Sequence, residues 1–294
     1  MVKSWVLEEI EGLNPETDYE RICYLSQCFD FPWDAARSTE MGLLNPYGIP
    51  QMSALLLGTG QLLGRERSRY ENTMLVFMGI VECGLTSDEG RTMVRHMNRM
   101  HGPHGIPSEV FRFTLAGSVL SQIRYNARFG WRPFSEKEKL GLFYFWREVR
   151  RYMNVTNYFA SLDEMEQFFD DFRRREFCYA ESNHILATEN VRFYTSLYPF
   201  APPPLIRALT LTLTDPAIVE ACGLPTVSPL TRQIIEGMMR LRAKVLRYFP
   251  RRSRGRPVMW TRMRHATFPR GFKPDMLATV PQAAPRSDAP APTT

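Results

Sequence analysis

Signals that begin helices recur along this chain and constrain its fold more than any other feature. Three Ser/Thr-x-x-Glu capping boxes stand ahead of apolar runs, and Ser228-Pro229 adds a serine followed by proline at a first helical position. The boxes are Thr86-x-x-Glu89, Ser135-x-x-Glu138 and Ser161-x-x-Glu164. We therefore predict an all-α fold.

The predicted helices cover most of the first 250 residues. Their ranges are 51–63, 69–83, 87–101, 107–128, 135–152, 161–176, 178–194, 203–213 and 229–249. Residues 209–213 alternate like a strand, and a buried helix is an equally good interpretation. With 44% apolar residues, the chain is long enough for one large core. We expect a single helical bundle over residues 1–280 and a disordered Ala/Pro/Ser/Thr tail over 281–294. Residues 259–280 contain three aromatic side chains and are expected to pack onto the bundle.

Two predicted helices combine polar side chains with apolar faces. Arg69, Asn72 and Thr73 are spaced i, i+3 and i+4, so they share a face that continues into an apolar stripe. His101 follows an apolar stripe of its own, and Gly102-Pro103 ends its helix. This combination suits a flat apolar cofactor with one axial ligand. Two ordinary interpretations stay open, namely a core histidine bonded to a carbonyl and a solvated charge run around residues 65–71.

The net charge of +6 comes from the C-terminal segment. Residues 251–294 contain nine Lys/Arg and two Asp, whereas the rest of the chain has 28 basic and 29 acidic residues. The near-neutral core lacks a basic stripe, so nucleic acid is not an expected partner. The basic tail permits peripheral contact with anionic lipid. The cysteines are odd in number and include no CxxC pair, which indicates reduced thiols rather than zinc.

No transmembrane segment is expected. The longest uncharged stretch, residues 41–64, contains two prolines and is interpreted as a loop followed by a buried helix. Charged residues interrupt any apolar leader near the N-terminus, as in Lys3 and Glu8. Together with the reduced cysteines, these features predict a cytoplasmic protein.

Several short motifs occur in an order and spacing that resemble a known family. They are Phe31-Pro32-Trp33-Asp34, Arg69-Tyr70-x-x-Thr73, Met97-Asn98-x-x-His101, Arg124 followed by Phe129-Gly130-Trp131-Arg132-Pro133, Phe145-Trp146-Arg147-Glu148, and Phe268-Pro269-x-Gly271-Phe272. The chain resembles the haem-dependent oxygenases that include bacterial rubber oxygenase, and most closely their fungal branch, typified by the enzyme that cleaves the farnesyl side chain in mycophenolic acid biosynthesis. The resemblance spans about residues 15–280. Unlike those fungal relatives that carry an N-terminal membrane anchor, this chain is expected to have none.

The resemblance implies a haem b cofactor with His101 as the axial ligand of its iron. Arg69, Asn72 and Thr73 would then face O₂ on the other side of the haem, and Arg69 and Arg124 would pair with the propionates. Surface ion pairing is the alternative for Arg124. Rubber oxygenase has lysine at the position of Asn72, so we expect an open sixth site and a neutral hydrogen bond to O₂. It also has an upstream carboxylate, for which residues 51–64 offer no Asp or Glu.

These implications predict a haem-dependent oxygenase that uses O₂ to cleave or oxygenate a C=C bond of a lipophilic substrate, isoprenoid or polyketide-like. The second nitrogen of His101 is expected to find a carbonyl or carboxylate partner. Two alternatives stay open. A di-iron helical oxidoreductase is one, because Glu181-x-x-His184 is a ligand pair of that type, although no second pair exists. The other is a non-catalytic haem-binding or scaffold protein of the same fold.

Overall fold

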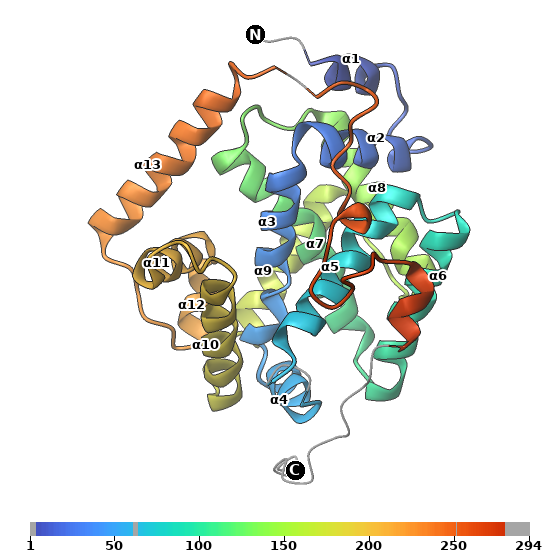
Figure 1. Cartoon of the computed structure of the whole chain (residues 1–294). Coiled ribbons are helices and arrows are strands. Elements are labelled where there is room, and N and C mark those ends of the chain that lie inside the picture. Colours follow the sequence, from blue (N-terminus) through green and yellow to red (C-terminus); the bar gives the residue numbers. More distant parts are fainter. Residues whose placement is uncertain (1–3, 61–63, 251, 280–294) are drawn as a thin grey trace.

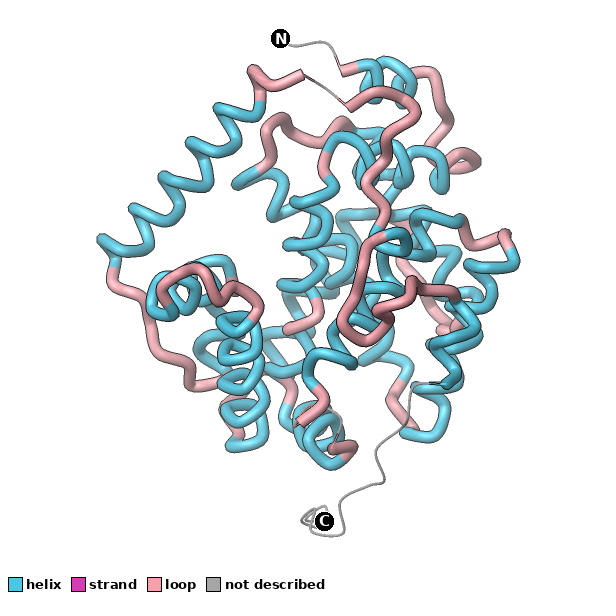
Figure 2. The backbone as a smooth tube through the Cα atoms, in the orientation of Figure 1, coloured by secondary structure: helices cyan, strands magenta, loops and turns pink. Residues whose placement is uncertain are grey.

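The computed structural model describes residues 4–60, 64–250 and 252–279, and every regular element among them is helical (Figures 1 and 2). This confirms the all-α prediction. The α-helices are α1 (Trp5–Glu11), α2 (Tyr19–Leu25), α3 (Pro32–Gly42), α4 (Pro50–Gly58), α5 (Glu66–Cys83), α6 (Asp88–His101), α7 (Ser108–Phe129), α8 (Glu136–Tyr152), α9 (Leu162–Glu176), α10 (Glu181–Ser196), α11 (Pro203–Leu213), α12 (Pro216–Ala221) and α13 (Pro229–Leu246). A π-helical turn, η1 (Ser26–Asp30), and four short 3₁₀ turns, η2 (Asn45–Gly48), η3 (Gly102–His104), η4 (Trp260–Arg262) and η5 (Pro274–Thr279), complete the list.

The capping residues explain where several helices begin. Ser135 forms a complete capping box with Glu138 at the start of α8. At the start of α9, Ser161 accepts the backbone N–H of Glu164 at 3.1 Å. The prediction of Thr86 was wrong by one residue, because the neighbouring Ser87 caps α6 instead. Residues 203–213 form α11, so the helical interpretation of that alternating segment is the correct one.

Helix α7 lies at the centre of the fold and carries much of the core (Figure 1). Helix α3 packs along it, and α8 and α9 pack beside it. Phe113 of α7 stacks on two α9 rings, with centroids 4.7 Å from Phe169 and 4.5 Å from Phe172. The main cluster of buried apolar side chains extends from Cys23 to Leu277, so segments from both ends of the described chain join it.

Two of the sequence motifs serve the architecture. Arg132 pairs with the buried carboxylates of Asp30 and Glu138, each at 2.6 Å, and its guanidinium stacks over Phe31. The indole Nε1 of Trp131 donates to the carbonyl oxygen of Asp30 at 2.9 Å. These contacts join the end of η1 to the beginning of α8, and their residues do not line the cavity described below.

The C-terminal segment crosses α5 and α6 as an extended strap, defined here as residues 258–279 (Figure 1). Two buried α5 carboxylates hold it. Glu82 accepts the backbone N–H groups of Trp260 and Thr261, and Glu71 accepts that of Thr267 at 2.7 Å. The expected packing of this segment onto the bundle is confirmed. The predicted disordered tail, residues 281–294, lies outside the described residues.

Candidate active site

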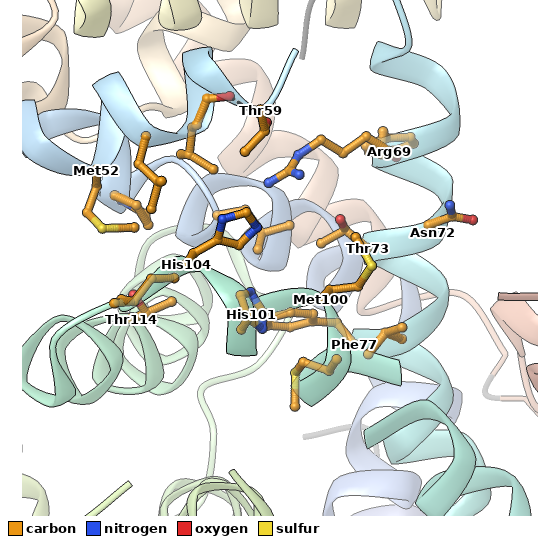
Figure 3. Close-up of a pocket in the computed structure, with 18 of the residues that line it drawn as sticks. Met52, Thr59, Arg69, Asn72, Thr73, Phe77, Met100, His101, His104 and Thr114 are labelled. Atoms are coloured by element: carbon orange, nitrogen blue, oxygen red, sulfur yellow. Dashed lines mark hydrogen bonds between the residues drawn. The ribbon is translucent and has the colours of Figure 1, made fainter. Parts of the chain in front are cut away.

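A cavity of about 490 Å³ lies between α4, α5, α6, α7 and α10 (Figure 3). Its volume falls in the range of sites for small molecules and cofactors. Most of its wall is apolar, including Met52, Leu55, Val76, Phe77, Leu115 and Leu277. Leu277 belongs to the strap, so the far C-terminal end of the described chain contributes to the same cavity.

Helix α5 supplies several of the polar residues in the wall. Arg69, Asn72 and Thr73 all line the cavity, as their spacing predicted. They span about 100° of the helix circumference. Figure 3 shows Arg69 directed across the cavity towards Thr59, with Thr73 one turn further along α5. Asn72 lies at the edge of this face, and its Oδ1 is sealed from solvent without a hydrogen-bond partner.

Arg69 is a cation without a counter-ion. Among the residues that the structure describes, no carboxylate pairs with its guanidinium. Tyr47 lies close by, but burial raises the pKa of its hydroxyl, which is therefore neutral at pH 7. Burial lowers the pKa of Arg69, but a guanidinium stays protonated at neutral pH. A buried charge is costly until an anion pairs with it. The site therefore favours a ligand that brings a carboxylate or another anion to Arg69.

His101 is the last residue of α6 and faces the cavity from the side opposite Arg69 (Figure 3). Its ring contacts Phe111 edge-on, with centroids 5.6 Å apart. Burial, and then the charge of Arg69, lower the pKa of His101, so its imidazole is neutral at pH 7. A neutral imidazole is the form that binds a metal.

The two ring nitrogens of His101 differ. Nδ1 is sealed from solvent and makes no hydrogen bond of ordinary geometry with a described residue. A backbone hydrogen bond to Met97 nevertheless acts to raise the pKa of the ring, so the expected carbonyl partner of His101 stays a prediction. Nε2 is the nitrogen that remains available to the cavity.

Two other histidines also line the cavity. His96 lies one turn and a half before His101, and burial lowers its pKa. His104 lies in η3, and Figure 3 shows its imidazole close to the cavity centre in this view. Although His104 lines the cavity, it is exposed to solvent.

His184 and His265 lie elsewhere. Nδ1 of His184 is 3.0 Å from the carbonyl oxygen of Cys222, and Glu181 accepts the hydroxyl of Tyr179. His265 stacks on Trp260 within the strap. Across the described ranges, no three His, Cys, Asp or Glu side chains gather as metal ligands would. The contacts of Glu181 and His184 are thus those of structural residues and do not assemble a di-iron site.

Arg124 does not line the cavity. Its guanidinium donates to Glu166 at 2.7 Å and to Asp170 at 3.0 Å, both on α9. The prediction that it pairs with a haem propionate is corrected accordingly. Its contacts are those of the alternative prediction, a surface ion pair.

A buried polar group beside the cavity was not predicted from the sequence. Tyr70 lines the cavity, and its hydroxyl donates to the carboxylate of Glu40 on α3. Arg37 pairs with the same carboxylate at 2.5 Å. Burial raises the pKa of Glu40 to about 7, although Arg37 and Tyr70 lower it. Thirty residues separate Glu40 from Tyr70 in sequence, so no local pattern connects them.

Comparison with known proteins agrees with this geometry. Residues 47–247 match the family described as ER-bound oxygenase mpaB/B'/rubber oxygenase, catalytic domain. The chain belongs to this family. The matched segment contains Arg69, Asn72, Thr73 and His101 and all five helices named above as surrounding the cavity. The family assignment predicted from the sequence motifs is confirmed.

Three curated fungal proteins are similar to the chain. The ER-bound oxygenase mpaB of Penicillium roqueforti is 27% identical over 44% of this chain and 45% of its own length. The mpaB' of Penicillium brevicompactum is 22% identical over 84% of this chain and 63% of its own length, and mpaB of the same species is 26% identical over 53% and 42%. The chain thus matches less than two thirds of the length of each of these relatives. Within residues 4–60, 64–250 and 252–279, no helix has the length and apolar character needed to cross a bilayer.

Proposed function

We propose that the chain is a haem b-dependent oxygenase that uses O₂ to cleave or oxygenate a C=C bond of a lipophilic molecule. One observation carries the proposal. A neutral imidazole, His101, and a cation that pairs with no carboxylate of the described residues, Arg69, face one apolar cavity from opposite sides. Haem b offers the matching parts, which are an iron that takes an imidazole ligand, an apolar ring and two carboxylates.

The residues of the cavity fit such a group without further protein ligands. His101 would hold the iron through Nε2, and Arg69 would pair with a propionate. When bound, the haem iron supplies the place where O₂ is held and activated. The chain contains no Cys-x-x-Cys-His sequence, so binding would be non-covalent.

The rest of the wall would select and position the substrate. Its apolar side chains exclude water and favour a hydrocarbon-like chain over a polar molecule. Thr73 offers a hydroxyl on the same face of α5 as Arg69. Tyr70 and Glu40 hold a proton at the edge of this wall, on a carboxyl group whose pKa of about 7 allows it to be released near neutral pH. Glu40 would thus supply a carboxylate near the cavity, in place of the upstream one that rubber oxygenase has and that residues 51–64 lack.

Haem titration of purified protein tests the cofactor. We expect a Soret band from the wild-type protein and loss of more than half of it in His101→Ala. His184→Ala is the matched control and should bind haem normally, because that imidazole bonds to the backbone carbonyl of Cys222 and does not line the cavity. His104→Ala should keep the band as well. A wild-type spectrum from His101→Ala would refute the assignment.

Oxygen isotopes test the reaction. The reduced, haem-loaded protein is incubated with ¹⁸O₂ and a panel of prenylated and polyene compounds, and the products are analysed by mass spectrometry. We expect ¹⁸O in a product cleaved or oxygenated at a double bond. Intact haem without labelled product across the panel would favour the non-catalytic haem-binding alternative.

A further inference from the structure

Helix α13 exposes a continuous apolar stripe to solvent. The stripe consists of Leu230, Ile234, Met238, Leu241 and Val245 on the helix and of Tyr248 in the turn that follows it, and these residues are between 44% and 87% exposed. Their spacing of four and three residues places them within about 80° of the helix circumference. The opposite face packs on the protein through Ile235, Met239 and Ala243. Helix α13 is therefore apolar on two faces. One face is buried against the rest of the protein, and the other is exposed to solvent.

The stripe lies on the outside of the molecule. Figure 1 shows α13 along one edge, with α11 near one of its ends. An aromatic side chain follows directly, since Phe249 is also exposed. Isolated exposed apolar residues are ordinary, but a contiguous stripe of this length marks a surface that binds something.

The charge around the stripe is mostly basic, although Glu236 on the same helix pairs with Arg240 at 2.7 Å. From Gly237 to Pro274 the sequence contains twelve Lys and Arg residues and no Asp or Glu. On the helix, Arg240 and Lys244 border the stripe and are exposed. Beyond its end, Arg252 and Arg256 are exposed as well. Apolar side chains bordered by basic ones complement a surface that is apolar inside and anionic at its boundary.

An anionic lipid bilayer is a surface of this kind, because its interior is apolar and its headgroups carry negative charge. An amphipathic helix with basic flanks lies in the plane of the interface and buries its apolar face among headgroups and acyl chains. Tyrosine and phenylalanine at its end suit the same boundary. Two-fold pairing with a second copy explains the stripe less well, because it would bring basic borders of two copies together.

We propose that α13 and the basic residues after it dock on an anionic bilayer surface, with the exposed stripe inserted into the interface. This surface is separate from the cavity, because none of the stripe residues lines it. The proposal requires no membrane-spanning segment. It does not depend on haem binding.

Vesicle flotation tests the proposal. Purified wild-type protein is mixed with vesicles of phosphatidylcholine and phosphatidylserine, or of phosphatidylcholine alone. We expect binding to the anionic vesicles that weakens with added salt, and about tenfold less binding by Met238→Glu/Leu241→Glu. The matched control is Arg91→Ala/Arg95→Ala on exposed positions of α6, which lowers the net charge by the same amount and should bind like wild type.

Three outcomes would overturn the proposal. The first is that the wild-type protein binds vesicles only at background level, and the second is that both double variants lose vesicle binding equally. The third is that the wild-type protein is a dimer, that Met238→Glu/Leu241→Glu makes it a monomer, and that this variant still binds vesicles like wild type. Hydrogen exchange of the wild-type protein gives an answer that is independent of how the variants fold. Residues 234–249 should become protected when anionic vesicles are added, and unchanged exchange there would also count against docking.

Discussion

The unpaired guanidinium of Arg69 permits a substitution whose effects on folding and on ligand binding should have opposite signs. In Arg69→Met the side chain keeps much of its length and apolar contact but loses its charge. Uncompensated buried charges cost several kcal/mol, and the cavity gives Arg69 some access to water. We expect the ligand-free variant to be about 1–3 kcal/mol more stable than wild type. The corresponding rise in Tm is about 2–10 °C.

The same change should weaken haem binding. A hydrogen bond to a charged group contributes about 1.5–3 kcal/mol, so losing the propionate partner should raise the Kd about 10- to 100-fold. Urea unfolding of the haem-free proteins and Soret titration measure the two effects separately. Arg124→Met is the control. Arg124 forms ion pairs with carboxylates of α9 and does not line the cavity, so its substitution should leave haem affinity unchanged. A destabilised Arg69→Met that binds haem like wild type would refute the reasoning.

Two further substitutions test the packing around the site. Glu82→Gln removes the charge that holds the strap, residues 258–279, so we expect a loss of about 1–3 kcal/mol and faster proteolysis of the strap, measured by urea unfolding and mass spectrometry. In Gly48→Ala the new Cβ would lie 2.8 Å from the ring of Phe177, which should cost about 1–3 kcal/mol. Gly58→Ala meets nothing within 4 Å and is the matched control, expected to keep or raise stability. Equal unfolding midpoints for the two glycine variants would contradict the packing argument.

Local signals determined how much of the fold was predictable. Helices α8 and α9 have serine caps and clear apolar periods, so their ranges were predicted to within one residue. Helix α3 was missed because its buried face contains polar side chains. Asp34 and Glu40 are buried there against Arg242 and Tyr70, partners that are distant in sequence. A helix of that kind has no apolar period to detect.

The same distinction holds for the candidate site. The shared face of Arg69 and Thr73 follows from spacing on one helix, and the structure places both at the cavity with His101. The position of Arg124 depends on which helix packs against α7, and its acidic partners on α9 could not be read from its own surroundings. Tyr47 reaches the cavity from η2 for a similar tertiary reason.

The buried carboxyl of Glu40 makes a last prediction about pH. Burial raises its pKa from an ordinary 4.5 to about 7, so between these values the folded state holds a proton that the unfolded state lacks. Its contribution to stability is therefore complete below about pH 4.5 and is lost as the pH rises through 7. A shift of this size corresponds to about 3 kcal/mol.

Unfolding by urea across pH 5 to 8 measures this contribution when wild type is compared with Glu40→Gln. The wild-type protein should lose about 2–3 kcal/mol relative to the variant over the range, because glutamine cannot titrate while all other groups are shared. Tyr70→Phe keeps the carboxyl and should keep the slope. Parallel profiles for wild type and Glu40→Gln would show that Glu40 does not titrate near neutrality. Tyr70 would then only line the cavity, and the proposal that Tyr70 and Glu40 hold a proton there would fail.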